Sequence, residues 1–132
     1  MQFSVRITEY QKKIMLNICD ADLLGKKIIQ DELTIHISES YYGEKFVERE
    51  EAESLLKDSS IINMVGKETV SLSVELGIGS ESGIKIISDV PFLIVFNIWL
   101  QIDWIFILHV LFDFNRNLFY LVGECLFIDW HN

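Results

Sequence analysis

Proline and cysteine are scarce in this sequence. One proline in 132 residues, half of which are apolar, excludes global disorder, because such a chain can bury enough surface to offset its ordering entropy. The two cysteines, Cys19 and Cys125, lie far apart and form no C-x-x-C pair and no zinc-binding spacing. We therefore expect a fold without disulfide or metal staples, with Cys19 as a buried thiol.

Basic charge is also scarce, and the formal net charge is −9. Residues 1–96 carry ten basic and sixteen acidic side chains, which gives −6, and residues 97–132 carry one and four, which gives −3. A chain this acidic repels phosphate backbones at long range, so direct nucleic-acid binding is expected to be weak or absent. Two short basic pairs, Lys12–Lys13 and Lys26–Lys27, have acids close by and are interpreted as solvated turns.

Catalytic and targeting signatures are missing as well. There is no Ser-His-Asp order, no H-E-x-x-H motif and no EF-hand loop, and the glycine-containing segment 77–83 follows a predicted helix where a phosphate-binding loop would precede one. The acidic run at 48–53 suits the solvated start of a helix. We expect no enzymatic activity, no cofactor and no metal, and we do not favour a small enzyme using Cys19 or His36. Without a secretory signal, the expected location is the cytoplasm.

Residues 97–132 differ from the rest of the chain. They contain no lysine and one arginine, but all three tryptophans and nine of the sixteen aromatic residues. So much apolar surface must be buried in its own domain, in a partner or second copy, or in a bilayer. Every even position from Phe92 to Phe114 is apolar, which favours strands, whereas the length from Pro91 to Phe112 would suit a membrane span. A frameshift product of AT-rich DNA is the third alternative.

The first 96 residues show patterns of both strands and helices. Alternating apolar residues predict strands over 3–7 and 14–18, which form a hairpin, and a third strand over 33–37 with His36 on its polar face. A single helical turn is expected over 20–25, between the second and third strands.

Two helices and two more strands are predicted further along. An acidic amphipathic helix is expected over 48–57, and a second helix over 61–76, where apolar residues recur at three- and four-residue steps. Strands follow at 84–87 and 92–96. The sequence therefore predicts an α+β fold: an antiparallel or mixed sheet of about five strands covered by two helices, with an apolar C-terminal extension. Three side chains are expected in its core: Leu16, Ile35 and Leu72.

Four short motifs occur in order along this part of the chain: C-D-A-D-L-L-G-K at 19–26, S-Y-Y-G at 40–43, I-N-M-V-G at 62–66 and V-P at 90–91. In this order they resemble a small archaeal family known as a domain of unknown function (number four-two-four). The resemblance implies an archaeal cytoplasmic protein, loosely associated with translation and RNA-processing genes, that has no established activity. Phe92 departs from the family pattern, where a polar residue, often histidine, is expected. The resemblance covers residues 3–96 and not the tail.

The candidate binding residues lie in two of these motifs. Tyr41 and Tyr42 beside Gly43 could form a stacking platform for a base, although one ring is expected to pack on the sheet because adjacent side chains point opposite ways. Asn63 and Gly66 could let the predicted second helix approach another backbone closely. We expect a non-enzymatic binding module of translation or RNA metabolism, with ribosomal or translation-factor proteins as partners. The alternative is an α+β module tethered to a membrane by its C-terminal tail.

Overall fold

The computed structural model describes residues 2–96, so the predictions made for residues 97–132 lie outside the described residues. The main sheet has six strands: β1 (Gln2–Tyr10), β2 (Lys13–Asp20), β5 (Lys45–Glu48), β6 (Ile61–Val65), β7 (Lys85–Ile87) and β8 (Val90–Phe96). A separate hairpin contains β3 (Lys27–Gln30) and β4 (Leu33–His36). The helices are α1 (Glu39–Tyr42), α2 (Arg49–Asp58) and α3 (Lys67–Glu75), and the 3-10 turns are η1 (Ala21–Leu23) and η2 (Glu81–Gly83).

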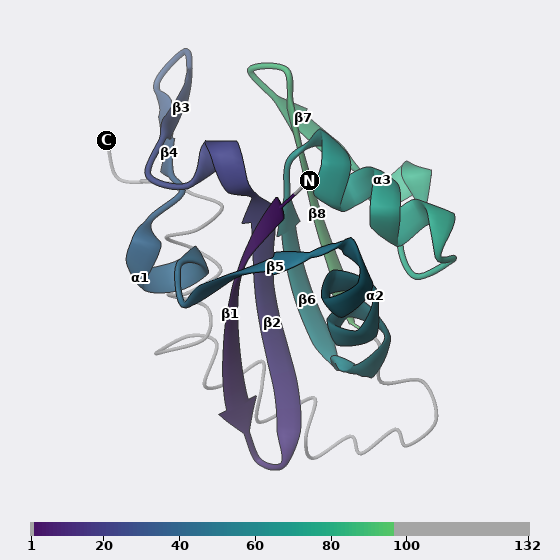
Figure 1. Cartoon of the computed structure of the whole chain (residues 1–132). Coiled ribbons are helices and arrows are strands. Elements are labelled where there is room, and N and C mark those ends of the chain that lie inside the picture. Colours follow the sequence, from purple (N-terminus) through teal and green to yellow (C-terminus); the bar gives the residue numbers. More distant parts are fainter. Residues whose placement is uncertain (1, 97–132) are drawn as a thin grey trace.

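The main sheet is mixed, with the strand order β5-β1-β2-β6-β8-β7. Strands β2 and β6 run parallel, and all other neighbours in this sheet are antiparallel. Parallel neighbours need a long crossover, which here contains the β3–β4 hairpin, α1, β5 and α2 (Figure 1). The predicted α+β class is therefore confirmed, with six strands in the sheet where about five were expected.

Apolar side chains pack on both faces of this sheet. On the first face, buried residues of the central strands pack with α2 and α3: Phe3, Val5, Leu16, Ile18, Ile62, Met64, Leu56, Leu72 and Leu93. On the second face, alternate strand residues pack with α1 and the β3–β4 hairpin: Cys19, Val65, Phe92, Ile28, Ile35, Ile37 and Tyr42. The predicted burial of Leu16, Ile35, Leu72 and the Cys19 thiol is confirmed.

The helix predicted over 61–76 is wrong in its first part. Residues Ile61–Val65 form β6, which lies between β2 and β8, and all five are buried. A strand covered on both faces is a nearly continuous apolar run, as β6 is apart from Asn63, and such a run also satisfies the spacing of an amphipathic helix. The helix α3 begins only at Lys67, because Gly66, with a φ of +110°, turns the chain between the strand and the helix.

Two other predictions need correction. The strand predicted at 33–37 exists as β4, but it pairs with β3 and not with the main sheet. Neither β3 nor β5 was predicted, because each has four residues of which only one is buried, too few to show an alternating pattern. The short helix α1 over Glu39–Tyr42 was not predicted either. The N-terminal hairpin, the single turn η1 and the acidic helix α2 are confirmed.

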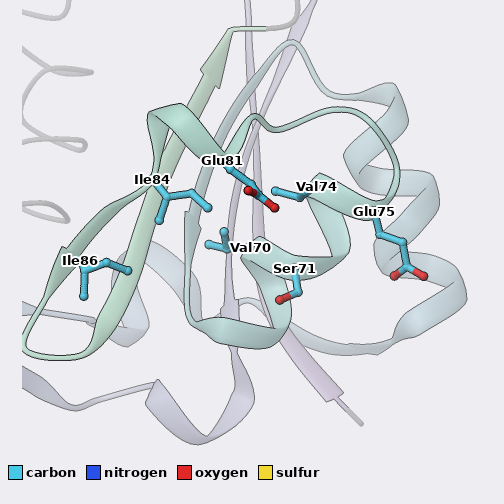
Figure 2. A pocket seen from close by; sticks show the side chains of 7 residues that line it. All are labelled: Val70, Ser71, Val74, Glu75, Glu81, Ile84 and Ile86. Atoms are coloured by element: carbon cyan, nitrogen blue, oxygen red, sulfur yellow. The ribbon is translucent and has the colours of Figure 1, made fainter.

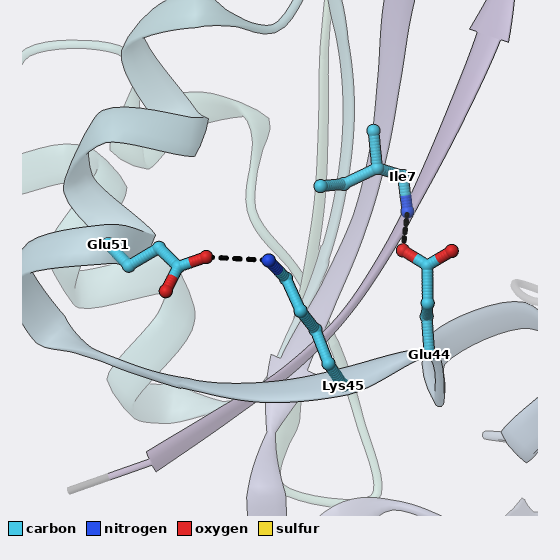
Figure 3. A network of polar contacts seen from close by, with 4 residues as sticks. All are labelled: Ile7, Glu44, Lys45 and Glu51. Atoms are coloured by element: carbon cyan, nitrogen blue, oxygen red, sulfur yellow. Dashed lines mark hydrogen bonds and ion pairs between the residues drawn. The ribbon is translucent and has the colours of Figure 1, made fainter.

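Polar contacts hold the edge strand β5 against its neighbours (Figure 3). The Nζ of Lys45 donates to Oε2 of Glu51 on α2 at 2.7 Å, and the backbone N–H of Ile7 on β1 donates to Oε1 of Glu44 at 3.3 Å. The hydrogen bond to Glu51 and the charge of that carboxylate raise the pKa of Lys45 above its ordinary value. Because both partners are about half exposed, this ion pair orients the edge strand and adds little stability.

Candidate functional site

The carboxyl ends of the parallel strands β2 and β6 lie side by side, and α3 begins there (Figure 1). Asp20, the last residue of β2, is buried, and its carboxylate accepts hydrogen bonds from three donors of α3. These are the backbone N–H groups of Glu68 (3.1 Å) and Thr69 (2.8 Å) and the Thr69 hydroxyl (2.7 Å). First-turn N–H groups have no partner within their own helix, and the helix dipole favours a negative charge beside them. Asp20 therefore caps α3 from a neighbouring strand.

Gly66 allows this close approach. A Cβ at this position would lie 2.4 Å from Cγ of Asp20, and the φ of +110° is one that residues with a side chain rarely adopt. The sequence placed Gly66 inside a helix, whereas the structure places it at the turn before α3, against a carboxylate. Because the protein's own carboxylate occupies the N–H groups of Glu68 and Thr69, they are not available to a phosphate.

A polar row crosses the second face of the sheet. Arg6 on β1 lies opposite Asn17 on β2, Asn17 lies opposite Asn63 on β6, and Asn63 lies opposite Ile94 on β8. Residues directly opposite each other in a sheet share a face, so the three polar side chains project from the same side. Both asparagines are 1% exposed, whereas Arg6 and Ile94 at the ends of the row are partly exposed.

Three amide atoms of the two asparagines are buried without a hydrogen-bond partner in the described part of the chain: Asn17 Oδ1, Asn63 Oδ1 and Asn63 Nδ2. The Nδ2 of Asn17 donates to the backbone carbonyl of Tyr41 at 3.0 Å. A buried polar atom that lacks a partner costs about 1–3 kcal/mol, and native structures contain few of them. The asparagine row is therefore the strongest candidate for a binding site among residues 2–96.

The tyrosine pair lies beside this row, on α1. Tyr42 is fully buried in the second cluster, and its backbone carbonyl accepts a hydrogen bond from the Ser4 hydroxyl at 2.6 Å. Tyr41 is half-buried, and its carbonyl binds Asn17. A Cβ on Gly43 would lie 2.7 Å from a backbone oxygen of α1, so this glycine lets the helix end. The pair thus docks α1 onto the sheet through its carbonyl groups, and only the ring of Tyr41 is partly accessible.

The structure brings Asn63 together with a residue that the sequence reasoning missed, Asn17. Asn17 interrupts the apolar pattern of β2 as Asn63 interrupts that of β6, and this shared interruption was the available signal. The two residues of the disfavoured enzyme alternative are not part of this row: Cys19 is fully buried in the second cluster, and His36 is exposed on β4. No group of three or more potential metal ligands occurs in residues 2–96.

Comparison with known proteins places the chain in a family. The family model described as "Protein of unknown function (DUF424)" matches residues 8–98. The chain belongs to the DUF424 family. This confirms the resemblance seen in the four motifs, and the tail beyond residue 98 lies outside the match, as expected. Asn17, Asp20, Asn63 and Gly66 all lie within the matched part of the DUF424 sequence.

The DUF424 fold is also similar to a solved structure. This is the crystal structure of an uncharacterized conserved protein from Methanopyrus kandleri, with 26% sequence identity and a TM-score of 0.60. The likeness covers 73% of this chain and 91% of that one, so the shared part is nearly the whole of the other protein. No curated protein matches the chain.

Proposed function

We propose that this DUF424 protein is a non-enzymatic binding module that serves translation or RNA metabolism in the cytoplasm of an archaeon. Its proposed partners are ribosomal or translation-factor proteins. The family resemblance supports the proposed link to translation or RNA metabolism in an archaeal cytoplasm. The binding role rests on one observation, the three buried amide atoms of Asn17 and Asn63 that have no hydrogen-bond partner within residues 2–96.

The chemistry of these side chains suits binding. A primary amide does not titrate near neutral pH and is a poor nucleophile, but it presents two donors and an acceptor. A peptide group or side-chain amide of a partner could donate to Oδ1 of Asn63 and accept from its Nδ2 at the same time, once the groups that bury these two atoms on the second face move aside. Arg6, which lies opposite Asn17, adds a positive charge to the row and would hold a carboxylate of the same partner.

The asparagine row lowers stability in a way that apolar side chains would not. Three unsatisfied atoms at about 1–3 kcal/mol each are a large part of the about 5–15 kcal/mol by which a typical domain is stable. Proteins commonly give up stability at positions where function needs a polar group. A partner that supplies hydrogen bonds to Asn17 and Asn63 would recover this free energy on binding.

The charge of the chain favours a protein partner over an extended nucleic acid. Residues 1–96 carry a net charge of −6, and within the row only Arg6 is basic. A long phosphate backbone would be repelled by the many surface carboxylates, whereas a protein segment with exposed amides and basic side chains would not. The module is therefore proposed to reach ribosomal particles through their proteins.

Co-sedimentation of the full chain with purified ribosomal subunits tests this function. The protein should pellet with a subunit in both low and moderate salt, because hydrogen bonds inside a buried contact are screened little by ions. The chain centrifuged without subunits is the control for aggregation. A protein that stays wholly in the free fraction at both salt concentrations would contradict the proposal.

A membrane-tethered module is the second candidate, and the apolar sequence of residues 97–132 favours it. Within residues 2–96, no helix is both long and apolar enough to cross a bilayer. Detergent phase partitioning of the full chain distinguishes the two candidates. Recovery in the detergent phase would support the tether, and recovery in the aqueous phase would count against it.

A further inference from the structure

A groove lies on the first face of the sheet, opposite to the asparagine row. It runs between α3 and the segment that contains η2 and β7, and its volume is about 630 Å³ (Figure 2). Four aliphatic side chains line it: Val70, Val74, Ile84 and Ile86. Ser71 and two carboxylates, those of Glu75 and Glu81, complete the lining. No lysine or arginine lines this groove.

The aliphatic lining extends from the core to the surface. Val70 is 2% exposed and belongs to the first cluster, whereas Ile86 is 58% exposed. Ile84 and Ile86 point into the groove, and Lys85 between them points to the other side of the strand because side chains alternate. Since β7 is the last strand of the main sheet, no further strand of that sheet flanks Ile86. Together with the other three aliphatic side chains, Ile86 forms a contiguous apolar surface, and such surfaces mark interaction sites.

The carboxylates that line the groove favour a positively charged ligand. Glu75 accepts a hydrogen bond from Nη2 of Arg49 at 2.8 Å, and that guanidinium also lies 3.6 Å from Glu53. In the described part of the chain, the Glu81 carboxylate has no ion pair. An apolar surface flanked by an uncompensated carboxylate complements a positively charged ligand and disfavours an acidic one.

We propose that this groove docks a basic amphipathic segment of a partner protein. Aliphatic side chains of the segment pack against Val74 and Ile86, and a lysine or arginine beside them pairs with Glu81. A second basic side chain competes with Arg49 for Glu75. The groove and the asparagine row lie on opposite faces and share no residue, so each site can bind without the other.

Titration of the methyl-labelled full chain with a synthetic peptide of leucine and lysine, followed by NMR, tests the groove. The peptide should shift the methyl signals of Val70, Val74, Ile84 and Ile86. Ile86→Ser should weaken binding about tenfold, because it removes an apolar contact, and Glu81→Lys about fivefold, because it reverses the rim charge. Both positions are exposed, so the fold should be retained.

Matched variants outside the groove are the controls. Ile29 is 60% exposed on β3 and Glu50 is exposed on α2, so Ile29→Ser and Glu50→Lys should leave the affinity unchanged. Equal binding of a leucine and glutamate peptide would overturn the proposal, as would shifts confined to other methyl groups. The methyl signals could also shift with protein concentration in the absence of peptide. If Ile86→Ser abolishes such shifts, a second copy of the chain covers the groove, and this result would also overturn the proposal.

Discussion

Replacing Gly66 with alanine is the sharpest test of the way the two parallel strands hold α3. The new Cβ would lie 2.4 Å from Cγ of Asp20, closer than such atoms approach in proteins, and Gly66 has a φ of +110°. The backbone therefore resists the substitution, and the carboxylate must move. If the carboxylate moves, its three hydrogen bonds to α3 lengthen or break.

The expected loss of stability has two parts. A residue with a side chain in this backbone region costs about 1–3 kcal/mol. Displacing Asp20 weakens hydrogen bonds to a charged group, each worth about 1.5–3 kcal/mol, and we expect the equivalent of one to be lost. The Gly66→Ala variant should therefore be less stable by about 2.5–6 kcal/mol, a large part of the stability of a domain of this size.

Urea unfolding of the full chain measures this change. Gly77→Ala is the matched control, because Gly77 also has a positive φ, +76°, but a Cβ added there would meet no atom within 4 Å beyond its own chain neighbours. It should lose about 1–3 kcal/mol through backbone strain alone. In an Asp20→Ala background the clash is absent, so Gly66→Ala should cost about 2 kcal/mol less than in the native chain. Equal losses for Gly66→Ala and Gly77→Ala would refute the reasoning.

Three further predictions concern stability. Leu16→Ala should cost about 2–5 kcal/mol, because Leu16 is fully buried in the first cluster, and an unchanged urea midpoint would contradict this. Thr69→Val should cost about 1 kcal/mol through the lost hydroxyl bond to Asp20, seen as a lower midpoint at unchanged helix content by circular dichroism. The pKa of Lys45 is raised in the folded state above its ordinary value of 10.5. The ion pair with Glu51 therefore stabilises the folded protein at pH values below 10.5, and this stabilisation is lost as the pH rises through the pKa of the folded state. Midpoints measured up to alkaline pH should therefore fall more for the native chain than for Lys45→Met.

Local pattern was sufficient for three elements, β1, β2 and α2. Apolar residues at every second position predicted β1 and β2, and the spacing of Ala52, Leu55 and Leu56 predicted α2. Pattern failed at Ile61–Val65, because a strand buried on both faces has no polar side to reveal its period. It also failed to show that β4 leaves the main sheet, since a strand looks the same whichever strand it pairs with.

The candidate site was predicted only in part, because a local sequence pattern does not show which strands pair with each other. Asn63 and Gly66 were predicted as positions where the expected second helix approaches another backbone closely. Their partners, Asn17 and Asp20, meet them only through the parallel pairing of β2 and β6, which joins segments more than forty residues apart in the sequence. A local pattern contains no information on such pairing, so the strand register had to come from the structure.

The most direct test of the proposed binding role compares Asn63→Leu with the native chain in co-sedimentation with ribosomal subunits. Leucine has the same number of side-chain heavy atoms as asparagine, and the Asn63 amide has no hydrogen-bond partner within residues 2–96, so the variant should be at least as stable as the native chain. The account predicts a folded variant, by its urea midpoint, that no longer pellets with the subunits. A folded Asn63→Leu variant that pellets as well as the native chain would contradict it.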